Sequence, residues 1–460
     1  MIERVINGKR KGFTLVELII VLAIMGMVFS LAGTMLVFST KSHTTVEQEY
    51  QIQSDIRLTS QVISNFIRQS SAIFMLNEVQ FDSTNLKEGW DYFSLNEDGT
   101  QVIQYRWDGS SNTHVPNVLA ESTPGLLYSL SFNKTENDSL LGGFNLSAIG
   151  QSGNVKVGID NELGALNSVV VDNTGNAGNP AVALAYRVDD IPDPSKPRIS
   201  VTLVLDKSGS MAWNLAGYSI TNGYNNPNSR LSIMRDRTLD LINELESIGN
   251  VHVAVVPFDT NANKNGNYHN LYNIDEHKAT IDDLVNGINI AQGGTNIGDG
   301  MRRAYYIHEG FKNSNSGTML HYNIQLMDGN PTYWSRYDDW PNGYYYGTGN
   351  IGNSTDTEVG GSGKETESNM NSSMDYIESV GDQLYILGDV QIKTFVIGFS
   401  GNEDNISRLS SIAGHVTSDT NPAIVGQYYK ASSSEALEQV YRDISRRIEM
   451  DAWHIFGPNN

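Results

Sequence analysis

The sequence predicts a chain of two differently built parts: an α+β part with a long N-terminal helix and an antiparallel sheet, then an α/β part with a doubly wound sheet. The first part is indicated by an almost continuously apolar stretch over residues 13–38, an amphipathic stripe behind it, and short strand candidates separated by turn signals. The second part is indicated by the alternation of strands and helices from residue 199 onward. With 460 residues, the chain is long enough for two or three domains.

The N-terminal helix is expected over residues 13–70. As a helix, residues 13–38 span roughly 39 Å, which is enough to cross a hydrocarbon core of about 30 Å. The basic residues that precede this segment keep the N-terminus cytoplasmic, so the bulk of the chain is exported. Beyond the membrane, a stripe of isoleucines predicts packing against a globular head: Ile52, Ile56, Ile63 and Ile67.

Residues 71–190 predict a β-rich head, and residues 191–198, which hold three prolines, predict a stiff extended linker. His114 is expected in an exposed loop of the head, and nothing there resembles a catalytic constellation. The strand candidates are Ala72–Met75, Tyr92–Leu95, Gln101–Trp107, Leu126–Phe132 and Val182–Val188.

The α/β part is expected over residues 199–448, with residues 449–460 as a C-terminal tail. Its apolar strands indicate a sheet covered on both faces, and ligands of such sheets bind beyond the carboxyl ends of the strands. The expected strands are Ile199–Asp206, Val251–Phe258, His321–Met327 and Ile392–Phe399, and the expected helices are Asn228–Ile248, Asn296–His308, Ser373–Leu387 and Ser433–Ile448.

Oxygen-bearing side chains from three segments converge on that edge of the sheet. The first strand ends in Asp206-x-Ser208-x-Ser210, a glycine-rich loop presents Thr295 before a helix, and Asp328 follows the third strand. Carboxylate and hydroxyl oxygens are ligands for hard divalent cations, so the sequence predicts a metal site there.

Composition excludes several classes of function. The net charge of -21 repels nucleic acid and anionic surfaces, and the absence of cysteine excludes disulfides and thiolate metal sites. The histidines of the α/β part have no recognisable partner spacing, so no general base for hydrolysis is indicated and no enzymatic activity is expected.

The segment Gly12-Phe13-Thr14-Leu15-Val16-Glu17 resembles the class III signal of type IV prepilins. The resemblance implies that residues 1–12 are a leader, that prepilin peptidase cleaves after Gly12, and that Phe13 becomes a methylated N-terminus. It also implies that Glu17 serves filament assembly by pairing with the α-amino group of a neighbouring subunit. A simple signal anchor is the alternative.

The three segments that carry Asp206-x-Ser208-x-Ser210, Thr295 and Asp328 together resemble the von Willebrand factor A domain and its metal-ion-dependent adhesion site. The resemblance implies a Rossmann-like fold and one divalent cation, with Mg²⁺ favoured and Mn²⁺ or Ca²⁺ left open. One coordination position would remain for a carboxylate of a partner. The residue before Asp328 is Met327, where the family usually has threonine. The implied ligands are Asp206, Ser208, Ser210, Thr295 and Asp328.

Two aromatic-rich insertions, residues 212–227 and 330–370, are expected to emerge on the metal face and to set specificity for a protein ligand. The alternative is that their aromatic side chains pack on the module itself. The candidate specificity residues are Trp213, Tyr218, Tyr224, Tyr333, Trp334, Tyr337, Trp340, Tyr344, Tyr345 and Tyr346.

Together the motifs resemble the modular adhesive minor pilins of type IV pili. The resemblance implies a membrane-bound precursor that moves to the bacterial surface pilus, contacts with other pilins, and binding of host glycoproteins such as fibronectin, fibrinogen or collagen. Two alternatives stay open: a structural minor pilin whose module primes assembly or holds a partner subunit, and a membrane-anchored receptor that never polymerises.

Overall fold

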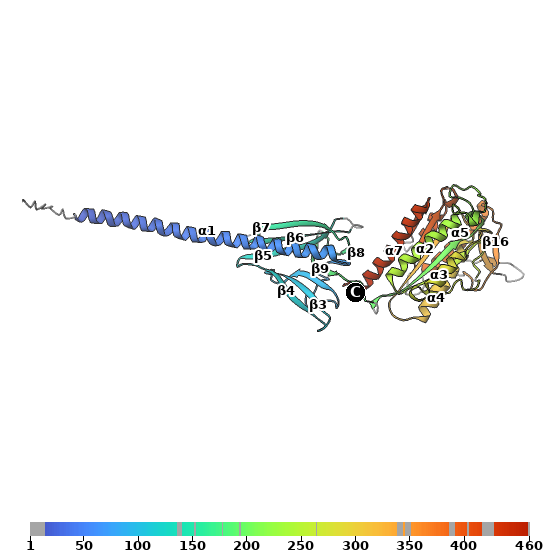
Figure 1. Cartoon of the computed structure of the whole chain (residues 1–460), viewed down its shortest axis with the longest axis horizontal. Helices are drawn as coiled ribbons and strands as arrows, with labels where there is room; N and C mark the ends of the chain where they lie inside the picture. Colours follow the sequence, from blue (N-terminus) through green and yellow to red (C-terminus); the bar gives the residue numbers. More distant parts are fainter. Residues whose placement is uncertain are drawn as a thin grey trace, which may run out of the picture. The chain divides into compact units, whose positions relative to one another are not determined.

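The computed structural model describes residues 14–135, 140–150, 153–176, 178–192, 195–263, 265–337, 344–345, 351–385, 392–402, 404–415 and 427–458. The chain divides into two compact units, Met1–Asp189 and Asp190–Asn460. The first unit holds the long helix and a mainly antiparallel sheet, in which only β1 and β8 pair in parallel among the described strands, and the second is an α/β unit (Figure 1).

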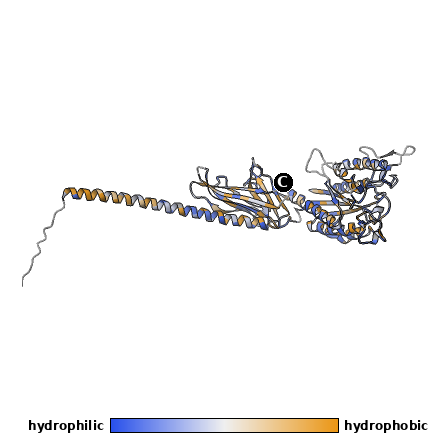
Figure 2. Ribbon diagram, turned by 90° about the horizontal axis from the view of Figure 1, so that it is seen from above, coloured by the Kyte–Doolittle hydropathy of each residue, from blue (hydrophilic) through white to orange (hydrophobic). Residues whose placement is uncertain are grey.

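The first unit is built on helix α1, Leu15–Gln69, whose 55 residues correspond to roughly 80 Å. Thr14 and Glu17 form a capping box at its start, where the Thr14 hydroxyl accepts from the Glu17 amide and the Glu17 carboxylate accepts from the Thr14 amide. The N-terminal part of α1 is exposed and apolar on all sides (Figure 2), and the helix is long and apolar enough to cross a membrane. The isoleucine stripe is buried: Ile52, Ile56, Ile63 and Ile67.

The sheet of the first unit contains β1 to β9, and α1 packs against β4, β6 and β7. Its longest path runs in the order β4-β3-β2-β9-β5-β6-β7, with β1 paired to β8 and β9. Phe93 and Tyr186 stack at 5.0 Å in the core between helix and sheet. The strands are β1 Ala72–Asn77, β2 Asp91–Leu95, β3 Gln101–Asp108, β4 Thr113–Glu121, β5 Leu126–Lys134, β6 Leu141–Gly150, β7 Val155–Gly164, β8 Val170–Asn173 and β9 Ala181–Arg187.

Strands β4, β6, β7 and β8 are absent from the sequence-based prediction. Most side chains of β4 and β7, at the two ends of the strand path, are exposed or half-buried, so β4 offers little apolar alternation. Strand β7 does alternate, through Val155, Val157 and Ile159, and this signal could have identified it. His114 was expected in an exposed loop, which is wrong. It lies in β4, where its Nε2 atom is 2.8 Å from the Trp90 carbonyl oxygen and its ring lies against Trp107.

The second unit has a six-stranded sheet in the order β12-β11-β10-β13-β17-β18. Parallel pairing joins β11, β10, β13, β17 and β18, while the short β12 is antiparallel to β11. The strands are β10 Arg198–Asp206, β11 Val251–Phe258, β12 Tyr272–Asn273, β13 Met319–Met327, β17 Ile392–Phe399 and β18 Gln427–Ala431.

Helices cover both faces of this sheet (Figure 1). Helix α2 packs against α3 and α7 on one side, and α4 packs against α5 on the other, where it encloses a core with Val204, Val256 and Val396. The helices are α2 Arg230–Ile248, α3 Ile274–Asn286, α4 Ile297–Ser314, α5 Glu367–Tyr385, α6 Leu409–His415 and α7 Ser434–Phe456.

Helix α7 corrects the expected C-terminal tail. The helix continues to Phe456, so residues 449–456 are its last two turns and not a tail. The reason is packing, because Ala452 and Trp453 are 3% and 1% exposed. A hydrophobic pair of this size holds the helix well past Ile448, where the sequence-based prediction ended it.

Candidate metal centre

The candidate metal centre lies where β10 and β13 end side by side. Leu205 and Leu326 are partners in the parallel register, so Asp206 and Asp328 emerge next to each other at the same edge of the sheet. Ser208 precedes a short 3₁₀ turn, Gly209–Ala212, that carries Ser210. The structure therefore brings the first and third predicted segments together.

Direct hydrogen bonds link four of the five predicted ligands. The Ser208 amide donates to Asp206 Oδ1 at 2.7 Å, and the Ser208 and Ser210 hydroxyls share a hydrogen bond of 3.1 Å. The Ser210 hydroxyl donates to Asp328 Oδ1 at 2.8 Å. The Asp328 amide lies 3.4 Å from Asp206 Oδ2. Four oxygen-bearing side chains thus point to one small region.

Thr295 reaches the same region through backbone contacts. The Gly209 amide donates to the Gly293 carbonyl at 3.2 Å, which ties the threonine loop to the first loop. Thr332 closes the other side, since its amide donates to the Thr295 carbonyl at 2.9 Å and its hydroxyl accepts from the Thr295 amide at 3.2 Å. All three predicted segments are therefore neighbours.

The electrostatics of this site fit a cation. Asp206 and Asp328 are fully buried, and Ser210 is half-buried, so it lies toward the solvent side. Burial, together with the charge of Asp328, holds the pKa of Asp206 well above its usual range. Burial also raises the pKa of Asp328, although Arg230 opposes this effect. Two buried carboxylates with one cationic partner leave an excess negative charge that a divalent cation would neutralise.

The donor set restricts which metal chemistry is suitable. Among the described residues, no group of three or more His, Cys, Asp or Glu side chains could hold a metal ion. A cation at this edge would therefore depend on the hydroxyls of Ser208, Ser210 and Thr295 as well as the two carboxylates. Such an all-oxygen set suits Mg²⁺, Mn²⁺ or Ca²⁺.

Arg230, the first residue of α2, belongs to this site and is not among the residues that the sequence predicted. Its side chain is fully buried, and its Nη1 atom donates to Asp328 Oδ2 at 2.7 Å. Its Nε atom donates to the Asn214 carbonyl at 3.0 Å, and its Nη2 atom to the Ser400 hydroxyl at 3.3 Å. Arg230 thus joins Asp328 to the loop after the first metal segment. An arginine in the first turn of a helix carries no sequence signal for this role, because a solvated charge is equally compatible with that position.

The first aromatic insertion follows Ser210 directly. Trp213 and Tyr218 are 40% and 70% exposed, and the insertion folds back on itself through an antiparallel bridge between Trp213 and Ser219. The Trp213 amide donates to the Ser210 carbonyl at 2.9 Å, so this aromatic side chain is attached to the metal loop. Tyr224 lies in a 3₁₀ turn, Gly223–Asn225, and its side chain is outside the described residues.

The second insertion departs from its prediction at Trp334. This residue was expected in a specificity loop, but its side chain is 9% exposed and packs in the core beneath α4 and α5, so it is unavailable to a ligand. Trp334 lies in β14, Tyr333–Tyr337, which pairs with β15, Tyr344–Tyr345, and β16, Val359–Gly361. Successive side chains of β14 point to opposite faces of this small sheet, and the Trp334 side chain lies on the face that packs in the core.

Tyr333, by contrast, lies beside the metal edge. It is half-buried, and its ring covers Gly294 so closely that a Cβ atom at Gly294 would collide with it. Tyr337, Tyr344 and Tyr345 are described as strand backbone only, and Trp340 and Tyr346 lie outside the described residues. Gly12 and Phe13, the predicted cleavage and methylation residues, also lie outside them.

Comparison with known proteins identifies both parts of the chain. The prokaryotic N-terminal methylation motif matches residues 7–33. A PilB minor pilin from Streptococcus sanguinis is similar over 89% of this chain and 100% of its own, with 25% identity and a TM-score of 0.72. A point mutant of that protein, in which alanine replaces one aspartate, gives 26% identity, the same coverage and a TM-score of 0.73. The search among curated proteins gave no match.

These findings define the class of protein: the chain is a type IV minor pilin that carries a von Willebrand factor A module. Among proteins of known structure it is similar, over nearly its whole length, to the streptococcal PilB minor pilin. Its precursor is anchored in the membrane through the N-terminal apolar helix, and the protein is then exposed on the pilus surface.

Proposed function

We propose that the von Willebrand factor A module makes this minor pilin a metal-dependent adhesin. The observation that carries the proposal is the hydrogen-bonded set of Asp206, Ser208, Ser210 and Asp328 at the carboxyl edge of the sheet. Thr295 completes the five residues that would hold the cation. Pilins serve in assembly and attachment, and no enzymatic activity is proposed for this chain.

The residues of the module favour capture of a partner over storage of the metal. When bound, the cation would supply a Lewis-acidic position for a carboxylate of the partner. Arg230 already neutralises much of the Asp328 charge through its 2.7 Å ion pair. The hydroxyls add no charge, so the site would leave the cation with a net positive charge that attracts an acidic group.

The exposed aromatic pair beside the site supports a protein ligand. Trp213 is bonded to the metal loop and Tyr218 to the neighbouring Asn214, and exposed aromatic rings next to a charged anchor are typical of a protein-binding surface. We infer that the partner presents an acidic side chain flanked by apolar surface. Extracellular glycoproteins such as fibronectin, fibrinogen and collagen are the candidates.

We also propose a role in the filament, which the N-terminal motif supports. We propose that the leader is cleaved after Gly12, that Phe13 is methylated, and that Glu17 pairs with the α-amino group of a neighbouring pilin. In the monomer the Glu17 carboxylate accepts from the Thr14 amide and hydroxyl, at 3.0 and 2.9 Å. These hydrogen bonds hold it at the helix start, close to where a neighbour's N-terminus would have to dock.

Binding to immobilised fibronectin, fibrinogen and collagen tests the adhesive role. The wild-type full chain, Asp206→Ala and the control Asp236→Ala, an exposed aspartate on α2, would be compared with and without a chelator. We expect Asp206→Ala and the chelator each to abolish binding while pilus number stays normal. If pili are lost and the purified protein binds none of the three, the structural role is correct instead.

A further inference from the structure

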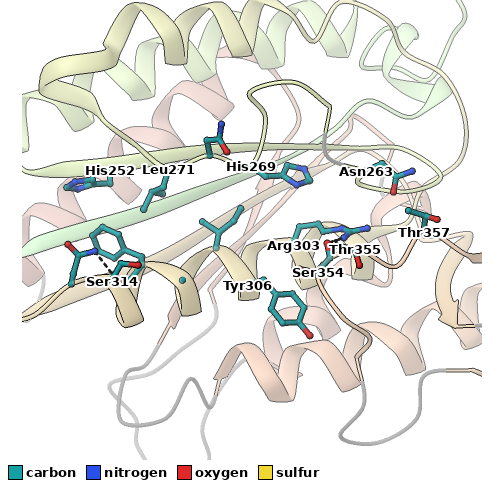
Figure 3. A pocket seen from close by; sticks show the side chains of 15 residues that line it. His252, Asn263, His269, Leu271, Arg303, Tyr306, Ser314, Ser354, Thr355 and Thr357 are labelled. Atoms are coloured by element: carbon teal, nitrogen blue, oxygen red, sulfur yellow. Dashed lines mark hydrogen bonds between the residues drawn. The ribbon is translucent and has the colours of Figure 1, made fainter.

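A large groove lies on the α/β unit away from the metal edge. Its volume is about 1110 Å³, and it runs between α4, the segment that follows β11, and the segment 354–357 (Figure 3). His252 near the start of β11 and Asn315 just after α4 lie at one end of it. None of the five candidate metal ligands lines the groove.

The lining is polar but without a free charge. Eight of its 15 residues carry a neutral amide or hydroxyl group, and no carboxylate is among the lining residues. The single cation, Arg303, is 5% exposed, and its guanidinium donates to the carbonyls of Ser354 and Asp356 and lies 3.5 Å from Asp299. The charge of Arg303 is therefore already balanced. Four of the neutral groups are already hydrogen-bonded within the protein: Tyr306 donates to the Gly352 carbonyl, Thr355 to Asn353, Asn315 to the Phe311 carbonyl and Asn270 to the Tyr272 hydroxyl. The other four belong to Asn263, Ser314, Ser354 and Thr357.

Aromatic and aliphatic carbon forms the rest of the wall. The His252 ring lies against Phe311 with centroids 5.0 Å apart, and Leu271 and Ile307 line the groove beside them. Burial lowers the pKa of His252, which keeps its imidazole neutral near pH 7 with one donor and one acceptor nitrogen. His252 and Leu271 lie toward one end of the groove, whereas Asn263, Ser354, Thr355 and Thr357 lie toward the other (Figure 3).

The backbone beside the groove is held in an unusual conformation. His269 has φ of 67°, a left-handed value that is rare for residues other than glycine. A hydrogen bond of 3.1 Å from its amide to the Val255 carbonyl fixes it there. Strain of this kind persists only where the surroundings enforce it, and here it fixes the backbone from which the His269 side chain reaches the groove.

We propose that this groove binds a neutral oligosaccharide of a few sugar units. A saccharide carries hydroxyls along its whole length, which match the side-chain amide and hydroxyls of Asn263, Ser314, Ser354 and Thr357, while its C–H faces match the aromatic and aliphatic carbon. An anionic ligand would find no free cation among the lining residues and would be repelled by a chain of net charge -21. A cationic ligand would find no carboxylate there. The groove is also larger than one small ligand requires.

An oligosaccharide array tests this assignment. The full chain, kept in a detergent without a sugar headgroup, would be applied to neutral oligosaccharides of hexose and N-acetylhexosamine units and to sialylated and sulfated counterparts. Chelator is present throughout, so that binding at the metal edge makes no contribution. We expect binding to neutral members only. Failure of chelator-sensitive protein binding would count against the adhesin proposal but not against this one.

Two variants locate the binding in the groove. Gly310, on α4, has open space where a Cβ would be, so Gly310→Trp obstructs the groove without disturbing the core. We expect it to weaken binding more than roughly tenfold, since the indole would occupy volume that the ligand needs. Asn263→Ala combined with Thr357→Ala removes two exposed polar groups and should weaken binding roughly 5- to 100-fold.

Gly414→Trp is the matched control. Gly414 is exposed on α6, also has open space around a Cβ, and does not line the groove, so this variant should bind like the wild type. The proposal is overturned if no neutral oligosaccharide binds, if only acidic members bind, or if Gly310→Trp and Gly414→Trp bind equally well.

Discussion

Arg230→Met is the perturbation that best tests how the metal edge is built. The Arg230 and Asp328 side chains are both fully buried and joined at 2.7 Å, and Arg230 also donates to the Asn214 carbonyl and the Ser400 hydroxyl. Removal of one member of a buried ion pair leaves an uncompensated charge and costs about 3–5 kcal/mol. For a unit of this size, that loss corresponds to a fall in Tm of roughly 6–20 °C.

The assay is thermal unfolding of the full chain in detergent, followed by near-ultraviolet circular dichroism, in chelator and in excess Mg²⁺. We expect the destabilisation by Arg230→Met to be larger in chelator than in Mg²⁺, because a cation would compensate the buried charge of Asp328 that the variant leaves unpaired. The control Arg235→Met, on the same helix, removes a half-buried side chain whose Nη2 atom lies 3.2 Å from the Ser232 hydroxyl, and should cost less than about 1 kcal/mol.

A double variant separates the ion pair from other effects of the arginine. If the cost of Arg230→Met arises from the unpaired carboxylate, Arg230→Met with Asp328→Asn should recover part of the loss in chelator. A loss below about 1 kcal/mol for Arg230→Met, the size of an exposed pair, would refute the reasoning.

Three further predictions concern other parts of the chain. Trp453→Ala should cost about 3–5 kcal/mol in urea unfolding, because this side chain is 1% exposed in the last turns of α7; an effect below about 1 kcal/mol would mean that these turns are a dispensable tail. Burial lowers the pKa of His321 to about 4, so the folded state resists protonation of this imidazole. The free energy of unfolding should therefore fall, by up to about 3 kcal/mol, as the pH drops from about 6.5 toward 4. His321→Gln should flatten the profile of urea midpoints against pH, and an unchanged slope would contradict the assignment. The double variant Trp213→Ala and Tyr218→Ala should weaken binding to the protein ligand by more than roughly tenfold in surface plasmon resonance without lowering Tm. If the double variant binds as well as the wild type, these two side chains do not contact the ligand.

The position of the metal edge could be predicted from the sequence because topology determines it. Asp206 and Asp328 each follow an apolar strand, and parallel strands deliver their carboxyl ends to the same edge. The register pairs Leu205 with Leu326, as that argument requires. The geometry of the side chains at the edge depends on tertiary packing, so the hydrogen bonds could not be predicted.

The features that could not be predicted from the sequence depend on which side chains are buried and which distant residues they contact. Arg230 is fully buried because Asp328 and Ser400 meet it, and both are distant along the chain. Trp334 turns inward because β14 pairs with β16. The Gly, Asn and Tyr residues of this insertion do not predict that strand pairing. In β6 the glycines Gly142, Gly143 and Gly150 shorten the alternating run, whereas the alternation of Val155, Val157 and Ile159 in β7 was a readable strand signal.

Isothermal titration of Mg²⁺ into the metal-free full chain tests the central claim most directly. The account predicts that about one equivalent binds to the wild type and that Asp206→Ala binds none, since the site has a single set of oxygen ligands. The exposed-site control Asp236→Ala should bind like the wild type. Equal binding by wild type and Asp206→Ala would contradict the claim that this edge of the sheet is a metal centre.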